Sequence, residues 1–282
     1  MKKVFLPRTM AECWPIFDVE PDARVYAGGT DLLVQMRHGK TDAPALICLE
    51  RIGELQGVRM HAATLWLGAG ATHADLLKDP LVHQYLRLLR QALPTLGSPL
   101  IRNMGTIGGN ICTASPAGDT LPPLYVLAAD VELHSREAMR LMPLKEFIAG
   151  PGQTRLAKGE ILAGIRVEIP TGFNVHHFEK IGQRQALACA IASMAALLTL
   201  SPAGVIEAAR LAWGSVGPTV VTSPDVEAAL IGEKLSRTTL AKAAGLARQA
   251  VSPIDDTRAS AVYRRYVAGN LLLRLATKPF PF

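Results

Sequence analysis

Two glycine-rich strings constrain this chain more than any other feature: Ala27-Gly-Gly-Thr-Asp-Leu-Leu33 and Thr106-Ile-Gly-Gly-Asn-Ile111. Because glycine has no Cβ, a glycine pair lets main-chain N–H groups come close to a ligand and allows positive φ. Successive N–H groups in such a turn form a concave site for an anion such as a pyrophosphate. Two such turns could hold one dinucleotide from both sides. For either pair alone, an ordinary tight turn is the alternative interpretation.

Neither string is a common nucleotide fingerprint. Gly-x-Gly-x-x-Gly is absent from both strings, which excludes the Rossmann interpretation, and the phosphate-binding loop pattern that ends in Gly-Lys-Ser/Thr is also absent. With 282 residues, the chain is long enough for two or three small domains. The strings therefore predict a different kind of nucleotide site on a multi-domain chain.

Charge and hydropathy exclude several classes of partner. The net charge of +6 comes from 30 basic and 24 acidic residues, without a block of five basic residues, so we expect no nucleic acid partner. The richest apolar stretch, residues 186–200, is too short and too mixed to span a bilayer. The segment 1–7 lacks the apolar core of a signal peptide, so we expect a cytoplasmic protein.

The four cysteines are scattered along the sequence and no pair has Cys-x-x-Cys spacing. We therefore expect neither a zinc site nor an iron–sulfur cluster within this chain, and no metal-binding residues. Buried small apolar side chains are the simplest interpretation of Cys13, Cys48, Cys112 and Cys189.

The first two thirds of the sequence alternate between short helical and extended patterns. Thr72 is predicted to begin a helix, with Asp75 completing a capping box. The second glycine string falls in a segment, 98–119, that reads as irregular, and a long irregular loop is usually functional. The other predicted helices cover residues 9–18, 31–37, 81–93 and 121–129, and the predicted strands cover 24–27, 45–49, 58–60, 64–68, 131–134 and 160–170.

The last third is predicted to be an antiparallel sheet followed by two helices. The strands are expected over residues 175–180, 188–200 and 205–213. The middle one is ambiguous, because its alanine content also favours a helix. The helices are expected over 239–251 and 259–275.

The order of these features resembles the FAD-binding medium subunit of the molybdenum hydroxylases, the family of xanthine dehydrogenase and carbon monoxide dehydrogenase. The first string matches one signature of that family, and Ile101-Arg-Asn-Met-Gly-Thr-Ile-Gly-Gly-Asn-Ile111 followed by Ala114-Ser-Pro-Ala-Gly-Asp119 matches another. Glu160-Ile-Leu162, Phe178-Glu-Lys-Ile-Gly-Gln-Arg184 and Tyr263-Arg-Arg265 follow in the expected order. The resemblance covers nearly the whole chain.

The resemblance implies an α+β fold in three parts. An α/β lobe (1–55) and an α+β lobe (56–171) would form a two-lobed FAD-binding domain of the vanillyl-alcohol-oxidase (PCMH) type, with FAD extended between the lobes. Residues 172–282 would form a C-terminal domain of an antiparallel sheet with a helical layer.

The resemblance also implies roles for single residues. Main-chain N–H groups of the first string would hold the pyrophosphate and the adjacent sugar, while the second string would hold the pyrophosphate and the ribityl chain from the other side. Asp119 would accept hydrogen bonds from ribityl hydroxyls, and Lys180 would lie at the pyrimidine edge of the flavin. Leu96 would contact adenine, and Leu162 and Ala163 would approach the isoalloxazine ring. The full set of expected FAD-binding residues is Ala27, Gly28, Gly29, Thr30, Asp31, Leu32, Leu96, Thr106, Gly108, Gly109, Asn110, Asp119, Leu162, Ala163 and Lys180.

Plainer roles remain open for two of these residues. Asp119 could instead cap the helix that begins near Leu121, and Lys180 could be a solvated strand residue. Two departures from the family pattern concern the flavin face and one branch of the family. Ala188-Cys189 stand where many relatives have an acidic or aromatic residue, and no cysteine-rich insertion follows Cys112, which disfavours the 4-hydroxybenzoyl-CoA reductase branch.

The function implied by the resemblance is electron transfer through noncovalently bound FAD, with no catalytic side chain in this chain. A large subunit would hold the molybdenum cofactor, and a small subunit would hold two [2Fe–2S] clusters. These two subunits would be the partners of this chain in a dimer of heterotrimers. FAD would pass electrons to an acceptor such as NAD⁺ or a quinone. The alternatives are a self-contained FAD oxidase or dehydrogenase of the same fold, and a nucleotide-binding module without catalytic turnover.

Overall fold

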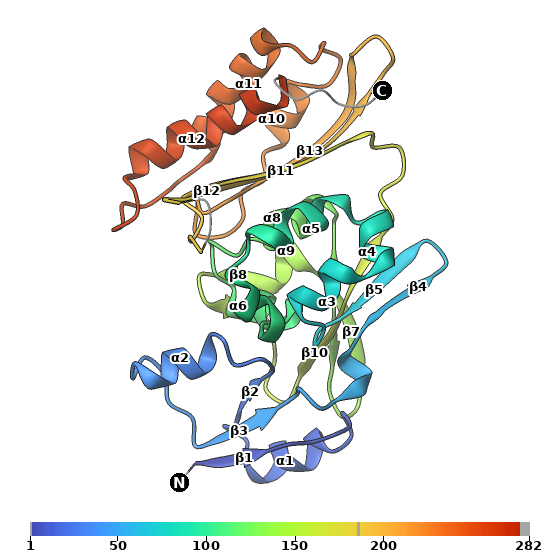
Figure 1. Ribbon diagram of the computed structural model, residues 1–282, viewed down its shortest axis with the longest axis vertical. Coiled ribbons are helices and arrows are strands. Elements are labelled where there is room, and N and C mark those ends of the chain that lie inside the picture. The colour runs from blue at the N-terminus through green and yellow to red at the C-terminus, as the bar shows by residue number, and fades with distance from the viewer. Residues whose placement is uncertain (1, 185–186, 277–282) are drawn as a thin grey trace. The chain divides into compact units, whose positions relative to one another are not determined.

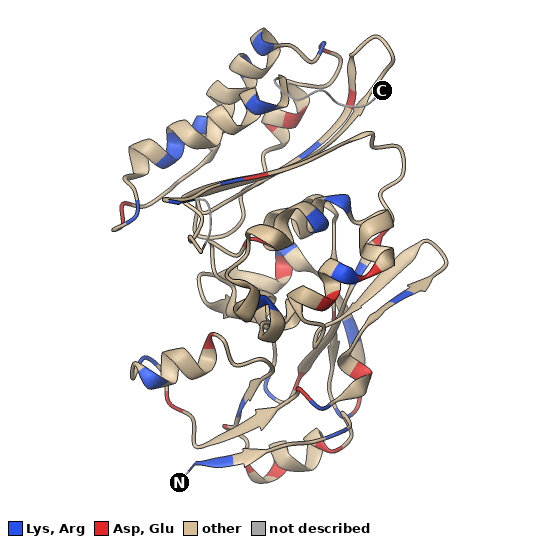
Figure 2. Cartoon of the chain, viewed as in Figure 1, with Lys and Arg blue, Asp and Glu red and all other residues tan. Residues whose placement is uncertain are grey.

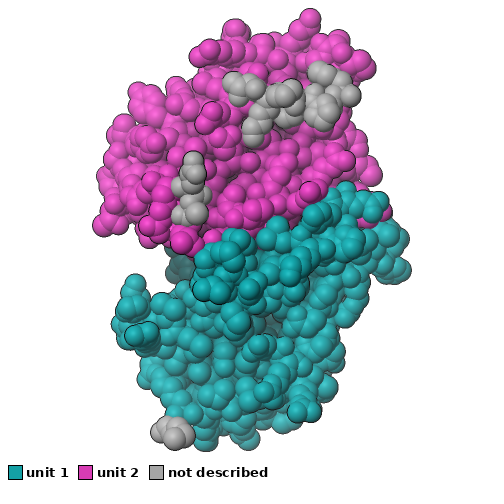
Figure 3. Space-filling view, in the orientation of Figure 1, with its two compact units in different colours: residues 1–84, 98–114, 128–168 teal, residues 85–97, 115–127, 169–282 magenta. Residues whose placement is uncertain are grey.

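The computed structural model describes residues 2–184 and 187–276, and the chain divides into two compact units (Figures 1 and 3). Unit 1 comprises residues 1–84, 98–114 and 128–168, and unit 2 comprises residues 85–97, 115–127 and 169–282. Each unit is therefore assembled from three separate stretches of sequence, and each is described by itself below.

Unit 1 begins with a small parallel sheet. Its strands are β1 (Lys3–Phe5), β2 (Arg24–Tyr26) and β3 (Ala45–Cys48), in the order β1-β3-β2. The central strand β3 is buried at every position, as the continuous apolar run Ala-Leu-Ile-Cys predicts for a strand covered on both faces. Helix α1 (Cys13–Val19) buries Cys13 in the same core as Ile47. Helix α2 (Leu32–Arg37) follows β2 after the first glycine string.

The larger sheet of unit 1 has five antiparallel strands in the order β4-β5-β10-β6-β7. These are β4 (Val58–His61), β5 (Thr64–Gly68), β6 (Asp130–His134), β7 (Met139–Pro143) and β10 (Ile161–Glu168). Leu65 and Leu67 of β5 are fully buried, and Ile165 and Val167 of β10 stand opposite them. Alternate residues of β5 and β10 thus form one apolar face. A bulge interrupts the pairing of β10 with β6 between Leu162 and Gly164.

Short helices complete unit 1. They are η1 (Gly53–Leu55), α3 (His73–Lys78), α4 (Pro80–Tyr85, at the unit boundary), α6 (Pro99–Met104), α7 (Ile107–Thr113) and α9 (Leu144–Phe147), beside the small strands β8 (Ile148–Gly150) and β9 (Gln153–Thr154). Helix α3 begins as predicted, because the Thr72 hydroxyl accepts from the Asp75 N–H and the Asp75 carboxylate accepts from the Thr72 N–H.

The prediction of an irregular segment over 98–119 is wrong for its first part. Ser98 caps α6, with Pro99 in the first helical position, and Thr106 caps α7, so the second glycine string lies inside a helix. The predicted helix over 81–93 is also wrong in its continuity. It breaks at Leu86, where the backbone leaves the helical region, into α4 and α5 (Arg87–Ala92).

Unit 2 is built on an antiparallel sheet of three strands, β11 (Val175–Ile181), β12 (Ala192–Leu200) and β13 (Ile206–Gly214), in that order. Helices α10 (Pro224–Ala228), α11 (Arg237–Ala250) and α12 (Ala261–Leu273) lie on one side of the sheet, and η3 (Arg274–Ala276) follows α12 (Figure 1). Helices α5, η2 (Leu93–Thr95) and α8 (Leu121–Val126) lie on the other side.

The central strand β12 resolves the ambiguity of the alanine-rich stretch. It hydrogen-bonds to β11 and β13 along its length, and its Met194, Ala196 and Leu198 are fully buried in the core of unit 2. A segment covered on both faces needs no polar alternation, so its composition alone could not distinguish a strand from a helix. The predicted α+β class with an antiparallel C-terminal sheet is confirmed. Among the described helices, none is both long and apolar enough to cross a membrane.

Candidate functional site

The first glycine string forms the turn between β2 and α2, and its two glycines serve different purposes. A Cβ at Gly28 would overlap the main-chain carbonyl of Met104, so only glycine allows this approach to the end of α6. Gly29 has a φ of +69°, in the left-handed region that glycine adopts without strain. Within the described part of the chain, the N–H groups of Gly28, Gly29 and Thr30 have no hydrogen-bond acceptor. Three consecutive free donors form the kind of concave surface that binds an anion.

The second glycine string differs from this expectation, because its N–H groups are already used. Gly108 donates to the Ala69 carbonyl and Gly109 donates to the Thr106 hydroxyl, both by way of their main-chain N–H groups. Neither glycine has positive φ. A Cβ at Gly108 would lie 2.6 Å from the Ala69 Cβ and 2.7 Å from its carbonyl oxygen, whereas at Gly109 it would meet only the Thr106 hydroxyl, at 3.0 Å. Gly108 therefore allows close packing, and Gly109 leaves an open surface.

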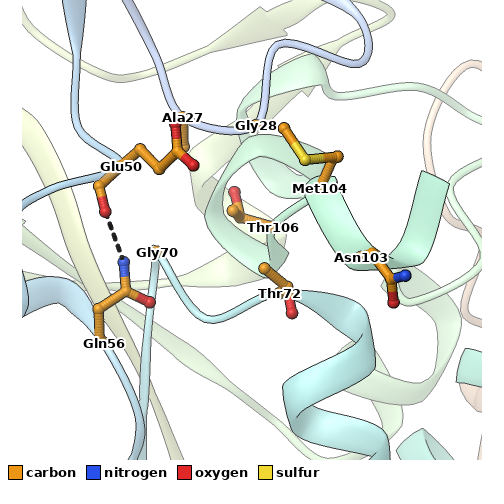
Figure 4. Close-up of a pocket in the computed structure, with 9 residues that line it drawn as sticks. All are labelled: Ala27, Gly28, Glu50, Gln56, Gly70, Thr72, Asn103, Met104 and Thr106. Carbon is orange, nitrogen blue, oxygen red and sulfur yellow. Dashed lines mark hydrogen bonds between the residues drawn. The ribbon is translucent and has the colours of Figure 1, made fainter. Parts of the chain in front are cut away.

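The two strings border one cavity of about 180 Å³ in unit 1 (Figure 4). An isolated β-bridge between Thr72 and Thr106 brings the start of α3 beside the start of α7. The lining residues are Ala27, Gly28, Glu50, Gln56, Gly70, Thr72, Asn103, Met104 and Thr106. Sequence reasoning anticipated only Ala27, Gly28 and Thr106 of this set. Gly70 could have been found from the sequence, because Gly68-Ala-Gly70 directly follows a predicted strand.

Asp31, which was expected to bind through its main chain, has its side chain engaged within the protein. Its carboxylate Oδ2 accepts from Gln35 Nε2 at 2.8 Å and from the Thr113 hydroxyl at 3.0 Å. The first string is thereby connected to the last residue of α7. The carboxylate thus links the first string to the helix that contains the second string.

His73, the first residue of α3, lies beside Gly105, between α6 and α7. It was not singled out from the sequence. Its main-chain N–H donates to the Gly105 carbonyl, and its imidazole is 2% exposed with Nδ1 unpartnered. Burial, together with the charge of Arg102, lowers the pKa of His73 from 6.5 to about 4. The imidazole is therefore neutral at physiological pH.

In unit 2, Asp119 and Lys180 form a buried ion pair. Lys180 Nζ donates to Asp119 Oδ2 at 2.6 Å and to the Thr95 carbonyl at 2.9 Å, and both side chains are 7% exposed. Burial raises the pKa of Asp119 from 3.8 to about 6, although Lys180 opposes that rise. Asp119 Oδ1 is buried without a partner.

This pairing rules out the plainer roles of both residues. Lys180 is not a solvated strand residue, and the cap of α8 is Thr120 rather than Asp119. The ammonium of Lys180 already has a counter-ion, so any effect on a ligand comes from the pair and not from a lone cation.

The remaining expected residues lie on apolar or partly covered positions. Leu96 follows η2 in unit 2 and is 8% exposed. Leu162 and Ala163 are buried at the bulge of β10, where Ala163 also packs in the core shared with Ile47. Leu32 begins α2, and Asn110 lies in the first half of α7, both half-buried. The expected residues thus fall into a unit 1 group and a unit 2 group, Leu96, Asp119 and Lys180.

The four cysteines, all expected to be buried, differ in their exposure. Cys13 and Cys48 are buried as expected, Cys112 is partly buried, and Cys189 is exposed, which corrects its interpretation as a core residue.

Comparison with known proteins identifies the arrangement. Residues 1–171 match the family model described as the FAD binding domain in molybdopterin dehydrogenase, and residues 177–278 match the CO dehydrogenase flavoprotein C-terminal domain. This chain belongs to the FAD-binding subunits of the molybdenum hydroxylases. Its relatives in this family are subunits of oxidoreductases, as the resemblance implied.

Relatives match this FAD-binding subunit over almost its full length. The carbon monoxide dehydrogenase medium chain of Afipia carboxidovorans is 31% identical, over 90% of this chain and 87% of its own. A putative xanthine dehydrogenase FAD-binding subunit of Escherichia coli is 30% identical, over 96% and 93%. The solved structure of quinoline 2-oxidoreductase from Pseudomonas putida has a TM-score of 0.93 at 26% identity, covering 98% of this chain and 96% of that one.

The residues present fit FAD. The free N–H groups of Gly28, Gly29 and Thr30 suit a pyrophosphate, which is anionic and accepts hydrogen bonds. The unpartnered Asp119 Oδ1 suits a hydroxyl donor, because a buried carboxylate oxygen without a partner is costly. Neither fit requires a residue to move out of an existing hydrogen bond.

Proposed function

We propose that this chain is the electron-transfer subunit of a molybdenum hydroxylase complex. It would take electrons from [2Fe–2S] clusters of a small partner subunit and deliver them to an external acceptor such as NAD⁺ or a quinone. The observation that carries the proposal is the row of three unpaired N–H groups at Gly28, Gly29 and Thr30, beside a cavity bordered by both glycine strings. The relatives named as medium chains or FAD subunits support the multi-subunit arrangement.

Each group of residues has a distinct task in this proposal. In unit 1, the N–H groups of residues 27–31 bind the pyrophosphate, and the Thr106 hydroxyl donates a hydrogen bond to the cofactor. Gly109 has no side chain and so leaves the adjacent surface open. Leu32 and Asn110 flank these contacts, and Gly108 allows α7 to pack against Ala69, directly after β5. Leu162 and Ala163 provide an apolar wall.

In unit 2, Asp119 accepts a hydrogen bond from a ribityl hydroxyl through Oδ1, while Lys180 holds Oδ2. Leu96 provides an apolar contact. When bound, FAD accepts electrons singly and releases them as a pair, which matches one-electron clusters to a two-electron acceptor. The protein's own residues bind and orient the flavin, and no side chain of this chain transfers a proton to a substrate.

The proposal extends to the arrangement of the whole complex. We propose that a molybdopterin-binding large subunit oxidises the substrate, and that the three subunits form a dimer of heterotrimers in the cytoplasm. The division of this chain into parts 1–55, 56–171 and 172–282 remains part of the proposal, and limited proteolysis of the FAD-loaded chain tests it.

The decisive experiment measures flavin and partners together. The chain, purified from its native host with a mild affinity tag, should carry one FAD per chain that acid precipitation releases completely. Metal analysis of the co-purified proteins should find molybdenum and iron. Yellow colour that stays with the acid pellet would show covalent attachment. A lone chain whose flavin is bleached by an added substrate at normal enzymatic rates would replace this proposal with the self-contained dehydrogenase.

A further inference from the structure

Arg264 is a buried charged residue that the proposed function does not use. It lies on α12 and is 4% exposed, while its neighbour Arg265 is exposed. Helices α11 and α12 carry basic side chains and no acidic ones (Figure 2), so the counter-ion of Arg264 must come from elsewhere. Asp256, in the loop before α12, provides it at 2.7 Å.

The guanidinium of Arg264 binds two main-chain carbonyls besides Asp256. Nη1 donates to the Ile191 carbonyl at 2.7 Å and to the Ser215 carbonyl at 3.1 Å. These carbonyls lie just before β12 and just after β13, so one side chain ties together the ends of two strands. Asp256 is fixed in turn, because it also accepts from the N–H groups of Arg258 and Ala259.

The residues that supply these two carbonyls, Ile191 and Ser215, are connected to the Asp119–Lys180 pair through main-chain hydrogen bonds and the sheet. Ile191 donates its N–H to the Ile181 carbonyl, next to Lys180. In the sheet, Lys180 stands opposite Ser193, and Ser193 stands opposite Gly214, the neighbour of Ser215. Ser215 donates its N–H to the Pro116 carbonyl at 2.8 Å, in the loop that carries Asp119. One route from Arg264 therefore reaches Lys180, and the other reaches Asp119.

Ser215 is held in a conformation that it would not adopt freely. Its φ is +63°, which an L-residue other than glycine adopts at a cost of about 1 kcal/mol or more. Its side-chain hydroxyl is buried without a partner, so local side-chain bonding does not stabilise this conformation. The bonds that fix Ser215 are those of its backbone, to Arg264 on one side and to Pro116 on the other. A strained residue persists only where its surroundings impose it.

We propose that Arg264 is a positioning residue for the Asp119–Lys180 pair, acting through the carbonyl groups of Ile191 and Ser215. By fixing Ser215 in the left-handed region, it directs the Ser215 N–H onto the Pro116 carbonyl and so sets the loop that presents Asp119 Oδ1. This inference rests on the proposed function, in which that oxygen binds the ribityl chain.

The test uses Arg264→Lys in the full chain, with Arg265→Lys on the same helix as the matched control. Lysine keeps the charge, but its single ammonium cannot reproduce the planar fork that reaches Asp256 and two carbonyls. The apoprotein is titrated with FAD, and the dissociation constant is taken from the quenching of flavin fluorescence. We expect Arg264→Lys to weaken FAD binding roughly tenfold, the size of one lost charge-assisted hydrogen bond. Arg265→Lys should change it by less than about twofold.

Two further variants separate positioning from a general loss of stability. In the Asp119→Asn background, Arg264→Lys should have little additional effect on FAD affinity, because both changes act on the same contact. Ser215→Gly removes the backbone strain and should restore much of the affinity lost in Arg264→Lys. Hydrogen exchange of the apoprotein should be faster in Arg264→Lys for peptides covering residues 115–121 and 211–217, and unchanged in unit 1.

Each outcome decides between the two ideas. If the Arg264→Lys and Asp119→Asn effects on FAD affinity add fully, or if Ser215→Gly restores nothing, Arg264 has only a structural role and the inference is wrong. If the unmodified chain binds no FAD at all, the proposed function fails instead. If Asp119→Asn alone leaves affinity unchanged while the glycine string variants abolish it, the FAD site stands and the role of the Asp119–Lys180 pair is withdrawn.

Discussion

The Asp31 carboxylate accepts a hydrogen bond from the Thr113 hydroxyl, 82 residues later in the sequence, and so connects the first glycine string to the last residue of α7, the helix that contains the second string. A further bond from Gln35 fixes the same oxygen on α2. The turn that carries the free N–H groups of Gly28, Gly29 and Thr30 is therefore not flexible. It is braced from α2 and from the end of α7, which favours a preorganised anion site.

Replacing Gly28 with alanine should abolish FAD binding. The new Cβ would overlap the Met104 carbonyl, and because that atom is main chain, the first string itself would have to move. We expect the purified variant to contain less than about a tenth of the flavin of the unmodified chain, a loss of at least 1.4 kcal/mol of binding free energy. Gly53→Ala is the control, because nothing lies within 4 Å of its added Cβ. Equal flavin contents in the two variants would place the cofactor elsewhere.

Gly109→Val tests whether the second string binds the cofactor, with little effect on the stability of the fold. Gly109 is exposed, and its added Cβ would meet only the Thr106 hydroxyl, so a side chain there should change the stability of unit 1 by no more than about 1 kcal/mol. The same side chain would fill the open surface at which we propose the cofactor binds. We expect FAD content to fall sharply while the thermal unfolding of the apoprotein barely changes. Full flavin occupancy in Gly109→Val would show that the second string does not face the cofactor.

His73 should make the chain less stable in mild acid. Its pKa is lowered on folding, so the unfolded chain binds a proton that the folded chain rejects as the pH falls from 6.5 toward 4. Stability from this group is complete above pH 6.5, and about 2.5 kcal/mol of it is lost by pH 4.5. Urea denaturation of His73→Gln and of the unmodified chain at pH 4.5 and 7 measures the difference.

Asp119 acts in the opposite direction over an overlapping range of pH. Its pKa is raised on folding, so its contribution is fully present below pH 3.8 and is lost as the pH rises through about 6. The comparison of His73→Gln with the unmodified chain cancels this term, because both contain Asp119. The same dependence on pH in both proteins would contradict a buried, neutral His73.

The Asp119–Lys180 pair should show strong energetic coupling. Lys180→Met leaves a buried carboxylate without its cation, and Asp119→Asn leaves a buried ammonium, each at a cost of about 3 kcal/mol. The double variant should cost at least 1 kcal/mol less than the sum, roughly the lower range for groups in contact. Fluorescence of Trp213, buried in unit 2, follows this unfolding in a background with Trp14→Phe and Trp66→Phe.

The control for this coupling is the exposed pair Lys158–Asp22, whose side chains are 67% and 76% exposed. Its coupling should not exceed about 1 kcal/mol, because water screens the pair. Additive effects at Asp119 and Lys180 would mean that the two side chains do not depend on each other in solution.

The sequence predicted local structure well where local chemistry decides it. The Thr72–Asp75 capping box and the strands around the first glycine string needed only neighbouring residues. It failed at α7, because glycine disfavours a helix, and the packing of Gly108 on the Ala69 main chain outweighs that preference. Gly108 is therefore needed for this close approach, while its φ is that of an ordinary helical residue.

The candidate site could be predicted only in part, for a related reason. The glycine strings carry their own signature, but Gln56 and Glu50 enter the cavity from segments that have no such pattern. The Asp119–Lys180 pair joins residues 61 positions apart, so no spacing rule reveals it. The role of Arg264 depends on two carbonyl groups, which any residue could supply.

The assembly of each unit from three stretches of sequence has a consequence for how the protein is made. Unit 1 has all its residues once the ribosome has added residue 168. Helices α5 and α8 are made earlier, yet they pack on β11, β12 and β13, which come later. During synthesis, the apolar side chains of Leu88, Leu89 and Leu124 therefore remain uncovered until the strands that bury them have been made. A protein fragment that ends near residue 171, where the match to the FAD-binding domain ends, would leave these leucines uncovered. It should aggregate unless residues 172–276 are supplied as a second polypeptide.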